Sequence, residues 1–355
     1  MQKHIKLCYI IPDYDKNNIS HFYHLYEFLE NLSEKIDLFI IAEKGKGINI
    51  GKESYIQKFK FIPFRFLENF FILLKVRSKG YKSFYTHYGY ISAINAGIIT
   101  RLFGGKSYYW NCAMNWLFKP KFLSKLGINL SLKLSHYLVT GGEIMKQGYS
   151  KHYKLKKEKI LVIPNRINLK RFKFREIKKQ KNVLLFVHWL SKRKGADMIT
   201  QIALKLKPLI KDFKILVIGD GPYKENLLEE IEENKLKKYI DFIGFVPNKD
   251  IVEYYEKANL FILPSMEEGF PMSLLEPMAM GIPFVSFDVG AVKEISPETG
   301  QRFLVKPGDI DMFVHKIEIL LNDKEIYEKF KEEGLEKVKE YGMENVVEKF
   351  IKLFK

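Results

Sequence analysis

The chain alternates short apolar runs with longer segments whose apolar positions recur at helical spacing, and this pattern continues over its 355 residues. The short runs are bounded by Pro, Gly or Asp, as expected of buried parallel strands. In the first half we expect strands at 5–11, 38–42, 82–86, 106–110 and 137–140, and helices at 22–32 and 90–103. In the second half we expect strands at 183–188, 214–219, 240–244, 260–263 and 284–286. Strand–helix alternation in two series predicts an α/β protein with two Rossmann-like, doubly wound parallel sheets.

The length of the chain agrees with two domains. We expect an N-terminal domain at 1–164, a polar and basic linker at 165–182, and a C-terminal domain at 183–339. The Lys- and Glu-rich segment that begins at Lys324 predicts closing helices.

Composition excludes several classes of protein. No apolar run approaches the roughly 18–20 residues that span a bilayer. The first strand is stopped at once by Pro12-Asp13, which is unlike a signal peptide. Cys8 and Cys112 are too few for a disulfide framework, so we expect a reducing, cytoplasmic location. We find no cluster of metal ligands in the sequence, and we expect no bound metal.

The formal net charge of +17 is unevenly distributed. Residues 1–160 hold 26 Lys and Arg against 11 Asp and Glu, whereas residues 161–355 hold 33 against 31. Between Glu68 and Glu143 there is no acidic residue among many aromatic ones. Biased Lys usage in the genome is one interpretation, although such a bias would also enrich Glu. The other is a face for an anionic membrane or a pyrophosphate-linked acceptor.

Two further points concern possible partners. No nucleic-acid-binding motif accompanies the positive charge, so nucleic acid is not an expected partner. The segment 64–76 predicts an amphipathic helix with a very aromatic apolar side. Contact with a membrane and ordinary burial in the core both remain open for that side.

The segment after the run 261–263 carries the most informative chemistry. A turn containing Glu268 and Gly269 opens a helix, with Pro271 near its first position, where a missing N–H is tolerated. Free amides at such a helix start form a seat for phosphate. Glu268 is able to accept hydrogen bonds from a sugar, and Glu276 from the vicinal hydroxyls of a ribose. An exposed loop acid is the alternative for Glu268, whereas an unpaired Glu276 in an apolar helix would be expensive to bury.

The spacing Glu268-x7-Glu276, set between Leu-Pro-Ser and Met-Ala-Met-Gly-Ile-Pro, resembles the donor-site signature of retaining GT-B glycosyltransferases of the GT4 type, the glycosyl transferases group 1. Further segments agree with that family in the same order: 162–165, 185–187, 190–191, 194–195, 218–222, 242–246, Gly290 and Glu294. The resemblance is close over roughly residues 160–310, and only architectural over the first 150.

The resemblance implies the transfer of a hexose from a nucleotide-diphosphate sugar, for which we expect a UDP-sugar, with retained anomeric configuration and without a metal ion. The nucleotide sugar is a co-substrate, and no cofactor is implied. The acceptor would be a cell-surface glycan or a lipid-linked glycan at the inner face of the cell membrane. The donor would bind the second domain and the acceptor the first, with the last helix, about 340–355, packing on the first domain.

The resemblance also implies roles for individual residues. Lys194 would stabilise charge on the departing diphosphate together with the amides near Gly269 and Phe270, which makes Lys194 and Glu268 the expected catalytic residues. A solvated loop lysine is the alternative for Lys194. Glu276 would bind the ribose. Further donor contacts are expected from Gly269, Phe270, Pro271, Leu275, Arg193, Phe245 and Val246.

This sequence departs from the family at several positions. The Arg that usually precedes the phosphate-binding Lys is replaced by Trp189, which leaves Arg193 to compensate or Trp189 to stack on a ring. The glycine-rich N-terminal loop is missing, with His21 as a possible contact in its place. Asn111 stands where relatives carry a His near the donor sugar. Pro277 lies inside the signature helix, where we expect a kink.

These departures keep a second class of function open. A non-catalytic subunit that binds nucleotide sugars or acts as a scaffold in a glycan-assembly complex would retain both Glu residues. An epimerase or phosphorylase on the same fold is a third possibility, which the sequence around Glu268 favours less.

Overall fold

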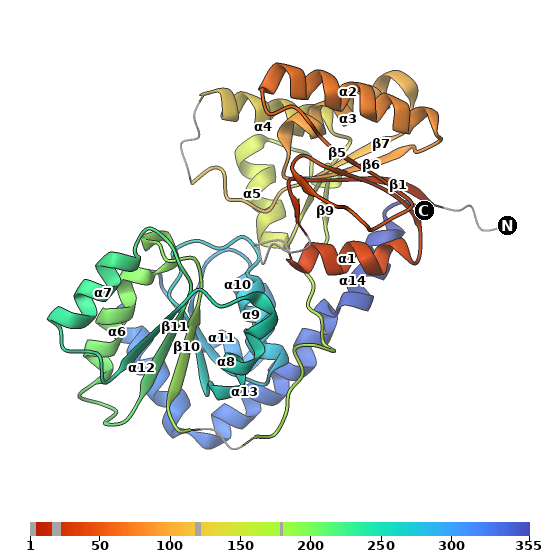
Figure 1. Ribbon diagram of the computed structural model, residues 1–355. Coiled ribbons are helices and arrows are strands. Elements are labelled where there is room, and N and C mark those ends of the chain that lie inside the picture. Colours follow the sequence, from red (N-terminus) through yellow and green to blue (C-terminus); the bar gives the residue numbers. More distant parts are fainter. Residues whose placement is uncertain (1–4, 16–22, 118–121, 178–179) are drawn as a thin grey trace. The chain divides into compact units, whose positions relative to one another are not determined.

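The computed structural model describes residues 5–15, 23–117, 122–177 and 180–355 (Figure 1). The chain divides into two compact units. The first comprises Met1–Pro164 together with Glu344–Lys355, and the second comprises Asn165–Met343. Residues 165–177 and 180–182, in the segment expected to be a linker, therefore belong to the second unit.

The first unit is built on a parallel sheet of seven strands in the order β5-β3-β1-β6-β7-β8-β9. Its strands are β1 (Lys6–Ile11), β3 (Asp37–Ala42), β5 (Glu53–Ile56), β6 (Ser83–His87), β7 (Lys106–Trp110), β8 (Tyr137–Thr140) and β9 (Ile160–Val162). A short pair, β2 (Tyr14–Asp15) and β4 (Gly45–Lys46), lies outside this sheet. The chain runs outward from β1 to β5 and then returns to β6 on the other side of β1. This reversal is the topological switch point of a doubly wound fold.

Helices cover the sheet of the first unit: α1 (Tyr23–Ser33), α2 (Ile62–Ser78), α3 (Tyr90–Phe103), α4 (Phe122–Leu134), α5 (Glu143–Tyr153) and α14 (Met343–Lys352). The final helix, α14, contributes to the core of this unit although it comes from the end of the chain. The ring of Phe350 packs 5.1 Å from that of Phe28 and 4.8 Å from that of Tyr85. The Tyr108 hydroxyl donates to the carbonyl of Leu353 over 3.0 Å.

The second unit contains a parallel sheet of six strands in the order β12-β11-β10-β13-β14-β15. Its strands are β10 (Val183–Val187), β11 (Lys214–Ile218), β12 (Ile240–Gly244), β13 (Leu260–Leu263), β14 (Phe284–Phe287) and β15 (Leu304–Val305). Its helices are α6 (Ile199–Leu206), α7 (Lys224–Glu233), α8 (Val252–Lys257), α9 (Met272–Ala279), α10 (Val292–Ile295), α11 (Glu298–Gln301), α12 (Ile310–Asn322) and α13 (Lys324–Lys337). The switch point lies between β10 and β13, so the loops after these two strands face one site.

The prediction of two doubly wound parallel sheets is confirmed, and the listed strands and the helices at 22–32 and 90–103 begin and end within one residue of their predicted bounds. The helix expected at 64–76 is longer by two residues at each end, at Ile62–Ser78. The alternation of strands and helices is visible in the sequence because strands such as β1 are continuous apolar runs. Five of the six residues of β1 are buried. Strands β5 and β15 escaped the pattern because they are short and partly exposed.

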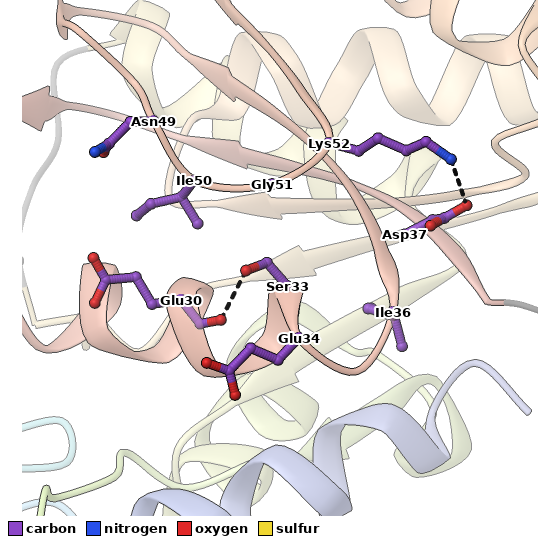
Figure 2. A pocket seen from close by; sticks show the side chains of 9 residues that line it. All are labelled: Glu30, Ser33, Glu34, Ile36, Asp37, Asn49, Ile50, Gly51 and Lys52. Atoms are coloured by element: carbon purple, nitrogen blue, oxygen red, sulfur yellow. Dashed lines mark hydrogen bonds and ion pairs between the residues drawn. The ribbon is translucent and has the colours of Figure 1, made fainter.

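The first unit has a hollow between the end of α1 and the segment before β5 (Figure 2). Its lining includes Glu30, Glu34 and Asp37, and the last of these pairs with Lys52 over 3.5 Å. Asp37 begins β3, so the hollow lies at the amino end of that strand. Ligands of doubly wound sheets bind at the carboxyl ends, and we therefore place the candidate site elsewhere.

Candidate functional site

Lys194 and Glu268 form a buried ion pair in the second unit. Lys194 ends the 3-10 turn η2 (Lys192–Lys194), which follows β10, and Glu268 lies in the loop after β13. The Lys194 ammonium donates to Glu268 Oε1 over 2.7 Å, and the exposed fractions of the two side chains are 9% and 7%. The structure thus brings together the two residues expected to be catalytic, at the carboxyl ends of two neighbouring strands.

His188 is the third member of this group. Its Nε2 lies 2.9 Å from the same Glu268 Oε1, and its Nδ1 accepts a 2.9 Å hydrogen bond from the backbone N–H of Trp189. Because Nδ1 accepts, the proton of the neutral ring is on Nε2, which donates to the carboxylate. Burial lowers the pKa of His188, against the opposing pull of Glu268. His188 is therefore a neutral donor that fixes Glu268.

The carboxylate of Glu268 is strongly acidic. Burial would raise its pKa, but His188 and Lys194 outweigh this and bring the pKa to about 2. Since His188 is neutral, we attribute most of the lowering to the Lys194 cation. The contacts with His188 and Lys194 both fall on Oε1. Oε2 is thus the oxygen through which an ionised Glu268 accepts hydrogen bonds from a ligand.

Neighbouring groups hold the ion pair in place. The Lys194 ammonium also donates to the backbone carbonyl of Glu267 over 2.9 Å. The side chain of Glu267 pairs with Arg193 over 3.5 Å, while burial raises the pKa of the Glu267 carboxyl. Arg193 is about half exposed. It is the charged residue expected to replace the missing family Arg, and its exposed guanidinium is compatible with that role.

Two glycines allow the backbone to pack closely around this site. Gly195 follows Lys194 with a φ of +76°, and an added Cβ would lie 2.0 Å from the carbonyl oxygen of Pro264. Gly290 has a φ of +54°, and its Cβ would lie 1.7 Å from the carbonyl oxygen of Glu268. Side chains at these positions would push away the loops that carry Lys194 and Glu268.

The turn after β11 packs on the segment after β10. The backbone N–H of Leu190 donates to the Asp220 carbonyl over 2.9 Å, and the N–H of Gly219 donates to Gly244 over 2.9 Å. The loops after β10, β11 and β12 therefore meet. The segment 219–222 is placed to shape the site beside His188.

Glu276 is buried in α9, at 6% exposure, and accepts a hydrogen bond from the hydroxyl of Tyr255 in α8. Pro271 is the N-cap of α9, one residue before the helix begins. Pro277 lies inside the helix, two residues before its end. The expected kink at Pro277 remains a prediction.

The other expected donor contacts differ in exposure. Phe270 is largely buried, and its carbonyl accepts a 2.9 Å hydrogen bond from the side chain of Asn165. The carbonyl of Gly269 accepts from the N–H of Ala291 over 3.0 Å. Leu275 is fully buried, so its side chain packs in the core and does not line an open surface.

On the open side of the second unit, Trp189 and Phe245 are both more than half exposed. Phe245 follows β12, and Val246 is half-buried beside it; both were expected to contact the donor. Trp189 is too exposed to be a core residue and is available for stacking on a ring.

Asn111 belongs to the first unit and is buried in a network of its own. Its amide donates to the Tyr109 hydroxyl over 3.0 Å and accepts from the Tyr149 hydroxyl over 2.8 Å and from the N–H of Ala113 over 2.9 Å. Both ends of the amide are thus used in holding the loop after β7. His21 lies outside the described residues.

His188 and Tyr255 are the residues that the sequence did not single out. The role of His188 depends on its contact with Glu268, 80 positions further along the chain. A polar ring directly after a buried strand, at the switch point, was the available signal. Nothing marked Tyr255 among the polar residues of α8.

The described residues contain neither a cluster of metal ligands nor a helix that could span a membrane. No group of three or more His, Cys, Asp or Glu there is arranged to hold a metal ion. No helix in the described ranges has the length and apolar character needed to cross a membrane.

Known proteins resemble both the second unit and the whole fold. The family model of glycosyl transferases group 1 matches residues 168–337. The 2-deoxystreptamine N-acetyl-D-glucosaminyltransferase of Niallia circulans is 32% identical over 144 residues, which are 40% of this chain and 37% of the relative. The amylovoran biosynthesis glycosyltransferase AmsK of Erwinia amylovora is 30% identical over 152 residues, which are 41% of this chain and 37% of the relative.

The chain therefore spans little more than a third of the length of these two curated relatives. Among solved structures, HepE of Anabaena in complex with UDP superposes with a TM-score of 0.81 at 13% identity, over 98% of this chain and 99% of that one. This likeness shows a common fold. The second unit thus matches the glycosyl transferases group 1 family, and the whole chain has the GT-B fold of glycosyltransferases.

Proposed function

We propose that the chain is a retaining glycosyltransferase that moves a hexose from a nucleotide-diphosphate sugar, a UDP-sugar in the first instance, to a glycan or lipid-linked acceptor. The observation that carries this proposal is the buried Lys194–Glu268 ion pair at the carboxyl ends of β10 and β13. A buried ion pair is weak evidence for stability alone, because desolvation offsets much of the attraction. The position of the ion pair, at the switch point of the sheet, favours a role in donor binding and catalysis.

Glu268 is proposed to bind the sugar. Its Oε1 is occupied by Lys194 and His188, which leaves Oε2 to accept from sugar hydroxyls. The neutral His188 orients the carboxylate and adds no second positive charge near the sugar. A fixed, ionised acceptor stabilises positive charge that develops at the anomeric carbon as its bond to oxygen breaks.

Lys194 is proposed to stabilise the leaving group. Two of its three N–H groups contact Glu268 and the Glu267 carbonyl, and we assign the third to an oxygen of the diphosphate. The bond between the sugar C1 and the diphosphate oxygen breaks, and the bonding electrons leave with the nucleoside diphosphate. The acceptor hydroxyl attacks C1 on the same face, and its proton goes to the departing phosphate. Lys194, Arg193 and backbone amides would take the place of a metal ion.

Glu276 is proposed to bind the ribose. The Tyr255 hydroxyl bonds its Oε2, which orients the carboxylate within α9. Two vicinal hydroxyls are good partners for an ionised acceptor. Phe245 and Val246 would flank the base, and their position after β12 agrees with that assignment.

The acceptor is proposed to be a cell-surface or lipid-linked glycan, met at the cytoplasmic face of the membrane. The support is the excess of positive charge over residues 1–160 and the absence of acid between Glu68 and Glu143. Such a surface suits a pyrophosphate-linked acceptor and the anionic lipids around it. The AmsK relative, by its name, acts in amylovoran biosynthesis.

The proposal is tested by following release of free nucleotide from a panel of UDP-, GDP- and ADP-sugars in EDTA. We expect slow hydrolysis of one donor class by the wild type, and a loss of about a hundredfold or more in Lys194→Ala. The control Lys238→Ala changes an exposed lysine before β12 and should keep full activity. Donor binding with no turnover on any acceptor would contradict the enzyme and favour a non-catalytic subunit.

A further inference from the structure

The first unit exposes apolar side chains along two of its helices, α2 and α4. Both helices pack against α3 in the first unit (Figure 1). Soluble proteins rarely leave large contiguous apolar patches uncovered, and such patches mark interaction sites. We call this surface the α2–α4 face, and define it by Phe61, Phe64 and Phe71 on α2 and before it, and by Phe122, Leu123 and Leu126 on α4.

Helix α4 exposes several large apolar side chains. Phe122 and Leu123 are 78% and 74% exposed, and Leu126 lies one turn further on and is also exposed. The side turned to the protein carries the small residues Gly127 and Ser131, which are buried. Gly127 fits against the ring of Tyr90 in α3, where a Cβ would lie 2.6 Å from a ring carbon. Leu132 is buried on the inner side as well, so α4 carries apolar side chains both towards the protein and on its exposed side, unlike an ordinary surface helix.

Helix α2 presents an aromatic cluster. Its inner side is formed by Asn69, Leu73 and Val76, so the exposed Phe64 and Phe71 lie on another side. The rings of Phe61 and Phe64 are 5.5 Å apart. Exposed aromatic side chains at this density are typical of surfaces that enter the boundary between lipid head groups and acyl chains.

Glu68 holds this cluster in place. Its carboxylate accepts hydrogen bonds from the N–H groups of Lys58 and Phe59, at 2.8 and 3.2 Å, and from the Tyr55 hydroxyl at 2.7 Å. The segment before α2 is thereby fastened to the helix, with the ring of Phe59 packed 5.8 Å from that of Phe64. The acid is thus used internally and does not offer a free negative charge to the surface.

The charge of the surrounding surface indicates what kind of partner binds the α2–α4 face. Exposed lysines flank the apolar side chains on both helices, among them Lys60, Lys75, Lys125 and Lys133. The sequence has no Asp or Glu from 69 to 142. A second copy of the chain would bring lysines against lysines, which repel each other. An anionic lipid surface matches both the charge and the apolar side chains.

We propose that the α2–α4 face inserts its aromatic and leucine side chains into the surface of an anionic bilayer, while the flanking lysines pair with lipid head groups. The inference deepens the membrane contact proposed above, because it adds insertion by two named helices to attraction by charge. It does not depend on the transfer reaction. Loss of insertion with intact donor hydrolysis would refute this inference alone.

Insertion is tested by site-specific fluorescent labelling. Cys8 and Cys112 are buried, so a cysteine introduced on the surface is labelled selectively with an environment-sensitive dye. A dye at Phe64→Cys or Leu126→Cys measures the polarity around the α2–α4 face. A dye at Leu209→Cys, which replaces a similarly exposed leucine of the second unit, is the control. With vesicles containing phosphatidylglycerol, we expect a blue shift at both face positions and none at Leu209. No shift in protein that co-sediments with the vesicles would overturn insertion.

Two further experiments distinguish membrane insertion from contact with a second copy of the chain. A blue shift that grows with protein concentration in the absence of vesicles would show that a second copy covers the face, and would contradict the proposal. Phe61→Ser/Phe64→Ser/Leu126→Ser should weaken vesicle binding by about tenfold or more, since it removes three inserted side chains. Leu204→Ser/Leu209→Ser, which changes exposed leucines of the second unit, should not weaken it. Circular dichroism checks that each variant is folded, and equal binding to neutral vesicles would contradict the role of the lysines.

Discussion

Lys194 and Glu268 are 74 positions apart in the chain, and yet the lysine ammonium lies 2.7 Å from the carboxylate. Each follows a strand next to the other in the sheet, β10 for Lys194 and β13 for Glu268. The topology of the second unit therefore places a buried cation and a buried anion at one point, where the loops after β11 and β12 also meet.

The ion pair predicts a pH dependence of stability. The folded-state pKa of Glu268 is about 2, below its ordinary value of 4.5. A depressed pKa adds stability that is complete above pH 4.5 and is lost as the pH falls towards 2. Urea unfolding of wild type and Glu268→Gln should show a difference on the order of 3 kcal/mol near pH 6 that shrinks over this window. Glu229→Gln, an exposed residue of α7, is the control. A difference that stays constant down to pH 2 would count against the pair.

His188 predicts a second pH effect at higher pH. Its pKa is lowered from 6.5, so the unfolded chain takes up a proton that the folded chain refuses. Stability should therefore fall as the pH drops below about 6.5. The free energy of unfolding of the wild type, relative to His188→Gln, should decrease between pH 7 and pH 5. An increase over this range would mean that His188 is a charged partner of Glu268.

Gly290 predicts a coupling between backbone packing and the site. Gly290→Ala places a Cβ 1.7 Å from the Glu268 carbonyl, and should displace the loop that carries Glu268. Gly308→Ala is the matched control, because its φ is also positive, at +87°, while nothing lies within 4 Å of the added Cβ. Both variants should lose about 1 kcal/mol through backbone strain. Only Gly290→Ala should also weaken nucleotide-sugar binding in calorimetry, and equal effects of the two would contradict the coupling.

The assignment of Glu276 and Tyr255 to the ribose predicts that they distinguish UDP from 2′-deoxy-UDP. Glu276→Gln should weaken UDP binding about tenfold or more, since it replaces a charged acceptor of hydroxyl protons. Tyr255→Phe should have a smaller effect in the same direction, because it only releases the carboxylate. Neither variant should change the binding of 2′-deoxy-UDP as much as it changes that of UDP. Equal losses for both ligands would remove the ribose assignment.

Much of the fold was predictable because buried parallel strands consist of continuous apolar residues, as in 260–263. The pairing of Lys194 with Glu268 was expected from the family resemblance, which assigns both residues to one donor site in the segments after β10 and β13. The contribution of His188 was not, since it rests on the N–H of Trp189 and on a carboxylate from another loop. The burial of the Leu275 side chain was also not apparent from the sequence. Its place in the signature motif suggested a ligand contact, whereas its helical position turns it into the core.

The most direct test of the account is a crystal structure of the protein with a non-hydrolysable analogue of its donor. The account predicts a diphosphate oxygen within hydrogen-bond distance of Lys194 Nζ, and a sugar hydroxyl donating to Glu268 Oε2 while His188 stays on Oε1. A donor bound elsewhere in the second unit, with Lys194 and Glu268 untouched, would contradict it.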